Sequence, residues 1–276
     1  MKNEIKKRFV DYGNDKDSIV SIFYVKSNTN DEFIDLYTVV DEIIIGKLEE
    51  ELRFLFDDII LINRSKDSFE IDKNKQNYTR LEAYKACNVK ISESIIAKDL
   101  AEDFIKKLPS DIEFIYNKPG EIKLSPNKDF KYESPKEYEF KACVDNFFAK
   151  AIEVSLYVNQ KDPLAASIKM EDLRKELIKM LNFHIINKFY GLRNMGKDGS
   201  ALISTLSKEY REDLELSFNT NELMDIYTCL FKACNLFRKV GMQEASNLGF
   251  PYNKEVDVNT LKLLRENYRK LESFLR

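Results

Sequence analysis

The chain has 276 residues, of which 43% are hydrophobic and 33% are charged, and its formal net charge is -3. Positive and negative residues are interspersed, so we expect no broad basic surface and do not expect nucleic acid as the partner. The first ten residues are charged and no apolar run reaches the roughly 18 residues of a membrane span, so we expect no membrane association and a cytoplasmic protein of one large or two ordinary domains.

Short runs rich in β-branched and aromatic residues dominate the first half of the chain and predict strands. They occupy 18–25, 35–40, 59–62, 78–84, 89–95 and 112–116. Between them, 47–56 and 98–108 carry apolar residues at helical spacing. The first half is therefore predicted to be a mixed α+β domain, in which helices flank a sheet.

A cluster of prolines separates the two halves. Pro109, Pro119, Pro126 and Pro135 are four of the six prolines and lie close to Gly120. Residues that break helices and strands gather in this way in linkers. We therefore predict an α+β domain at 1–125 and a helical domain at 126–276.

Long amphipathic stretches fill the second half and predict an all-helical bundle. The first helix start is at 134–137, with Ser134 as the N-cap and Glu137 closing a capping box. A second start is predicted at Asp162, which precedes a proline, and a third at 219–221. The predicted fold class is therefore α+β followed by a helical bundle.

The cysteines and the single histidine are predicted to be structural. Cys87, Cys143, Cys229 and Cys234 include no pair at metal-ligand spacing, so we interpret all four as reduced and buried. His184 lies at helical spacing from three leucines on an apolar face. We interpret it as a histidine of the core, since a catalytic or metal role would need partners.

Six short segments of the second half carry a family resemblance. They are 134–138, 147–148, 161–166, 176–181, 196–197 and 236–240. Their order and spacing resemble those of the carboxy-terminal domain of aminoglycoside 6-adenylyltransferases (streptomycin adenylyltransferases), which are polymerase-β-type nucleotidyltransferases. The resemblance implies a nucleotidyltransferase sheet domain before the bundle and transfer of AMP from ATP to an aminoglycoside hydroxyl. It also implies ATP and Mg²⁺ as cofactors and an aminoglycoside-like small molecule or a nucleotide as ligand.

In that family a Gly-Ser turn after the first strand cradles the triphosphate, and a D-x-D pattern on the next strand supplies two carboxylates to Mg²⁺. At the turn, the segment Lys26-Ser27-Asn28 keeps only the serine, so the resemblance makes Ser27 the nucleotide-binding residue. Asp35 is by resemblance the first carboxylate, a metal ligand and catalytic residue, and Tyr37 stands at the second position. A phenol ionises near pH 10 and is a poor ligand for Mg²⁺.

The third carboxylate of the family lies on a neighbouring strand, where the alignment places Lys90. Glu82 or Glu93 would take this position if the register slipped, because a slip of one residue turns a strand over. Lys90 then has two interpretations. It fills the space of a metal charge in a pocket that binds phosphate without catalysis, or it is a solvated residue of a site that no longer functions.

Two residues of the helical half correspond to functional positions of the family. By resemblance Asp162 takes the proton of the acceptor hydroxyl, and its alternative role is that of a helix N-cap. Lys197 follows Gly196 and by resemblance contacts a phosphate of the nucleotide, while its alternative is a solvated loop lysine.

Two functional hypotheses from different classes follow. The first is an adenylyltransferase that uses ATP and Mg²⁺ and acts on an aminoglycoside or similar polyol. The second is a non-catalytic relative that binds a nucleotide, a small molecule or a protein partner. A third and more distant one is an adenylyltransferase that modifies a protein or tRNA. The number of carboxylates gathered around Asp35 distinguishes the first from the second.

Overall fold

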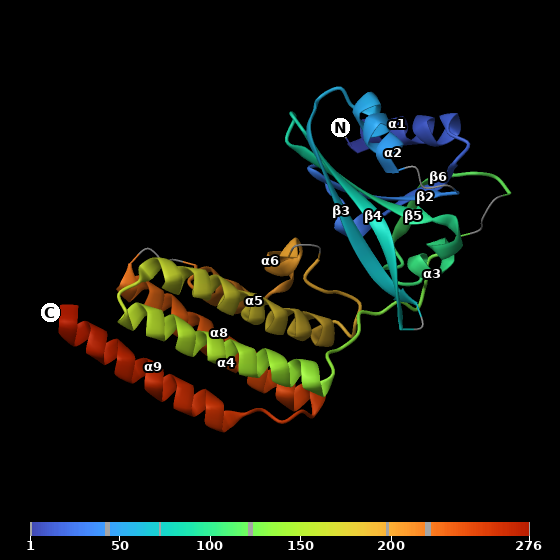
Figure 1. Cartoon of the computed structure of the whole chain (residues 1–276). Helices are drawn as coiled ribbons and strands as arrows, with labels where there is room; N and C mark the ends of the chain where they lie inside the picture. Colours follow the sequence, from blue (N-terminus) through green and yellow to red (C-terminus); the bar gives the residue numbers. More distant parts are fainter. Residues whose placement is uncertain are drawn as a thin grey trace. The chain divides into compact units, whose positions relative to one another are not determined.

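A computed structural model describes residues 2–41, 45–71, 73–120, 124–196, 199–218 and 222–275 (Figure 1). The chain forms two compact units, Met1–Phe130 and Lys131–Arg276. The first contains a six-stranded mixed sheet with helices, and the second is helical throughout its regular elements. The α+β class is confirmed. Among the described residues, every helix is too short or too polar to cross a membrane.

The sheet of the first unit has the strand order β3-β4-β5-β2-β1-β6. The strands are β1 Ile19–Val25, β2 Phe33–Val40, β3 Ile59–Ile71, β4 Asn74–Lys85, β5 Val89–Ala97 and β6 Ile112–Asn117. β2 and β5 run parallel, and the other four neighbouring pairs are antiparallel. The two central strands of the sheet are therefore β5 and β2.

One face of this sheet is covered by α1 (Lys2–Asp15) and α2 (Ile45–Leu55), as Figure 1 shows. The residues Ile5, Phe9 and Tyr12 of α1 are buried against the sheet, at the spacing of one helix face. This helix was not predicted from the sequence, because the charged residues of the first ten positions obscure its apolar face. The apolar spacing that identifies it was present.

The hairpin of β3 and β4 is longer than predicted. The sequence analysis ended the third strand at Ile62, but β3 continues to Ile71 and pairs with β4 over that whole length. The continuation is mostly polar and largely exposed. Its backbone hydrogen bonds to β4 hold it extended, and hydrophobic alternation does not reveal such a strand.

The opposite face carries a second, smaller core. The short helix α3 (Ala101–Ile105) follows the 3₁₀ turn Lys98–Leu100, so the helix predicted at 98–108 is interrupted and shorter. Phe104 of α3 contacts Tyr37, Phe69 and Tyr78, all of which project from this face. An aromatic cluster therefore lies directly beside the polar residues of β2 and β4.

The second unit is built on four long helices (Figure 1). The long helices are α4 Glu137–Asn159, α5 Pro163–Lys188, α8 Leu223–Leu248 and α9 Lys254–Leu275. Two shorter helices, α6 Leu202–Thr205 and α7 Lys208–Glu215, lie between α5 and α8 in the sequence. α4 packs against α5, α8 and α9, and α5 and α7 pack against α8. Phe147 and Phe237 stack in the resulting core with ring centroids 3.7 Å apart.

The predicted helix starts have mixed outcomes. Asp162 is the N-cap of α5, and its Oδ1 accepts a hydrogen bond from the Ala165 amide at 2.9 Å. The prediction of Ser134 as the first N-cap was wrong. The N-cap of α4 is Lys136, and the Glu139 side chain accepts a hydrogen bond from the Lys136 amide at 2.8 Å. The third predicted start, 219–221, lies outside the described residues.

The predictions for the cysteines and the histidine were mostly right. None of the four cysteines forms a disulfide; Cys143, Cys229 and Cys234 are buried, whereas Cys87 is exposed in the turn between β4 and β5. His184 is buried as predicted, with 7% of its surface exposed. Its environment is not purely apolar, because it contacts the buried carboxylate of Glu244.

Gly13 allows α1 to approach β6. A Cβ atom at this position would lie 2.5 Å from the ring of Tyr116. We predict that Gly13→Ala lowers the free energy of unfolding by about 1–3 kcal/mol through overpacking, although alanine favours helices. Urea unfolding measures this change. Asn14→Ala, at an exposed position of the same helix, is the matched control and should change stability by less than about 0.5 kcal/mol; equal effects would contradict the prediction.

Candidate functional site

The candidate site lies on the sheet face that carries α3. Side chains alternate between faces along a strand, so Asp35 and Tyr37 of β2 project from the same face. Asp35 is paired with Ser92 of β5, and Ser92 is paired with Glu82 of β4. Arg80 lies two residues before Glu82 on β4, so both side chains project from the same face of the sheet. Three adjacent strands thus bring two acids and an arginine together.

The guanidinium of Arg80 is the centre of this arrangement. Its Nη2 lies 3.1 Å from Oδ1 of Asp35, and its Nη1 lies 3.4 Å from Oδ2 of Asp67 on β3. Its Nε is 4.0 Å from Oε1 of Glu82 and has no hydrogen-bond partner among the described residues. A guanidinium stays charged at all accessible pH values. Three carboxylates therefore surround a cation that belongs to the chain itself.

Burial makes the contact between Arg80 and Asp35 the most important of the three. The side chain of Asp35 is only 5% exposed and that of Arg80 is 17% exposed, whereas Asp67 is 45% exposed. Removing a carboxylate from water is costly unless a charge or several donors compensate it. Arg80 supplies this compensation from within the fold.

Tyr37, at the second carboxylate position of the family, belongs to the aromatic cluster. Its ring stacks on Phe23 with centroids 5.3 Å apart, and its hydroxyl donates to Oδ2 of Asp35 at 3.5 Å. Burial and the neighbouring charge of Asp35 raise the pKa of Tyr37 well above its ordinary value. The phenol therefore keeps its proton and supplies no anionic oxygen.

Lys90 is paired with an acid of the same face. Its Nζ lies 2.7 Å from Oε1 of Glu82. Burial acts to lower the pKa of Lys90, but the hydrogen bond and charge of Glu82 outweigh it and raise that pKa. The β5 residue directly opposite Asp35 is Ser92, and Lys90 lies two residues earlier. Lys90 therefore neutralises Glu82, whereas Arg80 neutralises Asp35.

Glu93 projects from the opposite face of the sheet, beneath α1 and α2. It is 2% exposed and accepts a hydrogen bond from Thr38 Oγ1 at 2.6 Å. Desolvation raises the pKa of Glu93 to about 7. Of the two acids that the sequence left open, Glu82 shares the face of Asp35 and Glu93 does not.

Backbone amides of the turn that contains Ser27 already donate hydrogen bonds to Asp111. The Ser27 amide donates to Oδ2 of Asp111 at 2.8 Å, and the Lys26 amide donates to the Asp111 carbonyl at 3.0 Å. A phosphate cradle needs free amides and no competing negative charge. Asp111 occupies the amide and adds a negative charge at this turn.

The sequence also predicted two site residues in the second unit, Asp162 and Lys197. Asp162 caps α5, which is the alternative role that the sequence left open. Lys197 lies outside the described residues. Their assigned roles with the acceptor and the nucleotide stay predictions.

The arrangement does not fit a Mg²⁺ site. Hard divalent cations prefer several ionised or carbonyl oxygens around one point. The described residues include no group of three or more His, Cys, Asp and Glu side chains that could hold a metal ion. The first carboxylate faces Arg80, the second position is the phenol of Tyr37, and the residue opposite on β5 is Ser92.

Comparisons with known proteins identify the family. The family model for streptomycin adenylyltransferase matches residues 25–266. The chain belongs to the streptomycin adenylyltransferase family. An aminoglycoside 6-adenylyltransferase of Bacillus subtilis (strain 168) is 24% identical over 156 residues, 55% of this chain and 55% of that protein. The matched segment thus spans about half the length of this curated relative.

Two solved structures are similar to the chain. The crystal structure of an aminoglycoside 6-adenyltransferase from Bacillus subtilis has 19% sequence identity and a TM-score of 0.49, covering 97% of this chain and 98% of that one. A nucleotidyltransferase-like protein from Exiguobacterium sibiricum 255-15 has 8% identity and a TM-score of 0.37, covering 89% of this chain and 78% of that one.

Membership of the streptomycin adenylyltransferase family implies nucleotidyl transfer with ATP and a divalent metal. This family member places Arg80 against the first carboxylate instead. The sequence analysis missed Arg80, Asp67 and Tyr78. The alternation of Tyr78, Arg80 and Glu82 along β4 was a usable signal, because it puts a cation on the face of an acid.

We predict that Arg80→Met lowers the free energy of unfolding by about 3–5 kcal/mol, because it removes the guanidinium that pairs with the buried carboxylate of Asp35. The double variant Asp35→Asn with Arg80→Met should recover more than half of this loss, since it removes the buried negative charge as well. Guanidinium or urea unfolding of both variants measures the effect. A loss below about 1 kcal/mol for Arg80→Met would show that Asp35 does not depend on Arg80.

We predict a pH dependence that originates at Glu93. Its pKa in the folded state, about 7, lies above the ordinary value of 4.5, so the folded state binds the proton more tightly. The stabilisation is complete below pH 4.5 and is lost as the pH rises toward 7, a change of about 3 kcal/mol. Glu93→Gln should remove this slope and be more stable than the natural chain at pH 8. Unfolding curves between pH 5 and 8 measure it; parallel curves would contradict the assignment.

Proposed function

We propose that this chain is an aminoglycoside adenylyltransferase-like protein whose metal-dependent AMP transfer is absent or very slow, and whose role is to bind a small-molecule or nucleotide ligand. The observation that supports this proposal is the ion pair of 3.1 Å between Arg80 and the buried carboxylate of Asp35. A metal ligand must present its oxygens to the ion. Here the oxygen of Asp35 already has a fixed positive partner.

The surrounding residues support the same function. A two-metal mechanism needs carboxylates that bridge both ions and free amides that hold the triphosphate. Tyr37 replaces one carboxylate with a protonated phenol, and Asp111 engages the amide of Ser27. Each change affects a different part of the reaction. Together they oppose both the binding of Mg²⁺ and the placement of the triphosphate.

Calorimetric titration of the full chain with ATP, with and without Mg²⁺, tests the proposal. We expect Mg²⁺ to change the dissociation constant of ATP by less than about twofold, because Asp35 is held by Arg80. Asp35→Asn is the matched control and should bind ATP as the natural chain does. Binding that requires Mg²⁺ and is abolished by Asp35→Asn would overturn the proposal and establish a working metal site.

The second candidate function is adenylyl transfer from ATP to an aminoglycoside hydroxyl, with Asp35 as metal ligand and Asp162 as general base. The specific observation in its favour is that the Asp162 carboxylate is on the exposed surface of its unit while capping α5. Release of pyrophosphate in the presence of ATP, Mg²⁺ and streptomycin measures this activity. Asp162→Asn keeps the cap, since asparagine caps equally well, but removes the base. Activity that this variant loses at unchanged stability would establish the enzyme.

A further inference from the structure

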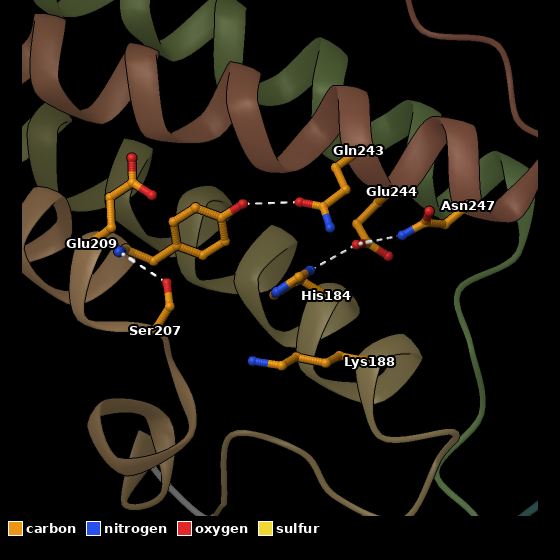
Figure 2. A pocket seen from close by; sticks show the side chains of 8 residues that line it. His184, Lys188, Ser207, Glu209, Gln243, Glu244 and Asn247 are labelled. Atoms are coloured by element: carbon orange, nitrogen blue, oxygen red, sulfur yellow. Dashed lines mark hydrogen bonds and ion pairs between the residues drawn. The ribbon is translucent and has the colours of Figure 1, made fainter.

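A polar pocket in the helical unit is independent of the sheet site. It has a volume of about 320 Å³ and lies among α5, α7 and α8 (Figure 2). The lining residues are His184, Lys188, Ser207, Glu209, Tyr210, Gln243, Glu244 and Asn247. Since a water molecule takes about 30 Å³ in the liquid, this volume accommodates a small molecule or one end of a larger one.

The floor of the pocket is a buried pair of side chains. Nδ1 of His184 lies 2.7 Å from Oε1 of Glu244, which is completely buried. Asn187 donates to Oε2 of the same carboxylate at 2.8 Å, and Asn247 donates to Oε1 at 3.4 Å. An ionised carboxylate only accepts hydrogen bonds, so the hydrogen on Nδ1 points to Glu244. Glu244 thereby fixes the orientation of the imidazole ring.

The second ring nitrogen of His184 is left for a ligand. Figure 2 shows one nitrogen directed to Glu244 and the other turned away from it. Nε2 has no hydrogen-bond partner among the described residues. Histidine is more than nine-tenths buried here. Nε2 is not one of the buried side-chain atoms that lack a partner, so it is accessible from the pocket, where water or a ligand can bind it.

One cation that lines the pocket has no acidic partner within the described ranges of the chain. Glu209 is paired with Lys239, and Glu244 has the three donors described above. Lys188 contacts the ring of Phe189, but no carboxylate pairs with its ammonium group in the part of the chain that the structure describes. Glu209 thus has a cation and Glu244 has hydrogen-bond donors as partners, whereas Lys188 has no acidic partner among the described residues.

A further donor comes from Gln243. Its Oε1 accepts a hydrogen bond from the Tyr210 hydroxyl at 2.9 Å, so its amide hydrogens remain available (Figure 2). Lys188, the amide of Gln243 and, when it carries a proton, Nε2 of His184 are donors that a ligand in the pocket can reach. We propose that this pocket binds the oxyanion group, a phosphate or a carboxylate, of a small molecule. Charge-assisted hydrogen bonds from Lys188 and His184 hold the anion.

The single histidine makes the test specific. In ¹⁵N-labelled full-length protein, one imidazole contributes signals, and they belong to His184. Titration with inorganic phosphate, acetate or methylammonium at constant ionic strength should give a saturable shift of Nε2 toward its protonated value with at least one of the anions. The phosphate and acetate arms identify the preferred anion. A saturable shift with methylammonium alone, or none with either anion, would overturn the proposal.

Lys188→Met separates a ligand site from a purely structural pair. We expect it to weaken anion binding roughly tenfold, the effect of one charge-assisted contact. Lys175→Met is the matched control, because it removes the same charge from the same helix at an exposed position outside the pocket. It should leave the affinity unchanged. Equal affinities in Lys188→Met and the natural chain would show that His184 and Glu244 only join α5 to α8.

Discussion

The first unit depends on how a buried carboxylate is neutralised. Asp35 lies on a central strand beside an aromatic cluster, where water cannot solvate its charge. Such a group needs a cation close to it, and either a bound metal ion or a basic side chain meets this need. In this chain the cation is covalently part of β4. The sheet can therefore close over Asp35 without any ligand.

This constraint also explains the neighbouring residues. Arg80 provides a positive charge to Asp35, and Lys90 pairs with Glu82 in the same way. The position next to Asp35 on β2 is filled by Tyr37, which extends the apolar packing of Phe23 and Phe104 up to the acid. The face combines ion pairs with aromatic packing. A catalytic metal site would instead keep this face hydrated and rich in free oxygens.

The two units thus treat their buried charges differently. In the sheet unit, the buried carboxylate of Asp35 is paired with the guanidinium of Arg80. In the helical unit, Glu244 is satisfied by His184 and two amides, while a second nitrogen and Lys188 remain directed at a pocket. Hydrogen-bonding capacity that the protein does not use itself is where a ligand gains affinity.

The sequence by itself determined the fold class, the family and the positions at which this chain differs from the family's metal-binding pattern. Hydrophobic alternation and helical spacing report which residues must be buried, and Tyr37 at a carboxylate position is visible without coordinates. Only the tertiary structure decided what neutralises Asp35. Arg80 is 45 residues away along the chain, and its contact depends on the register of β4, β5 and β2. The pair of His184 and Glu244 likewise joins two helices, because local patterns record burial but not which distant side chains meet.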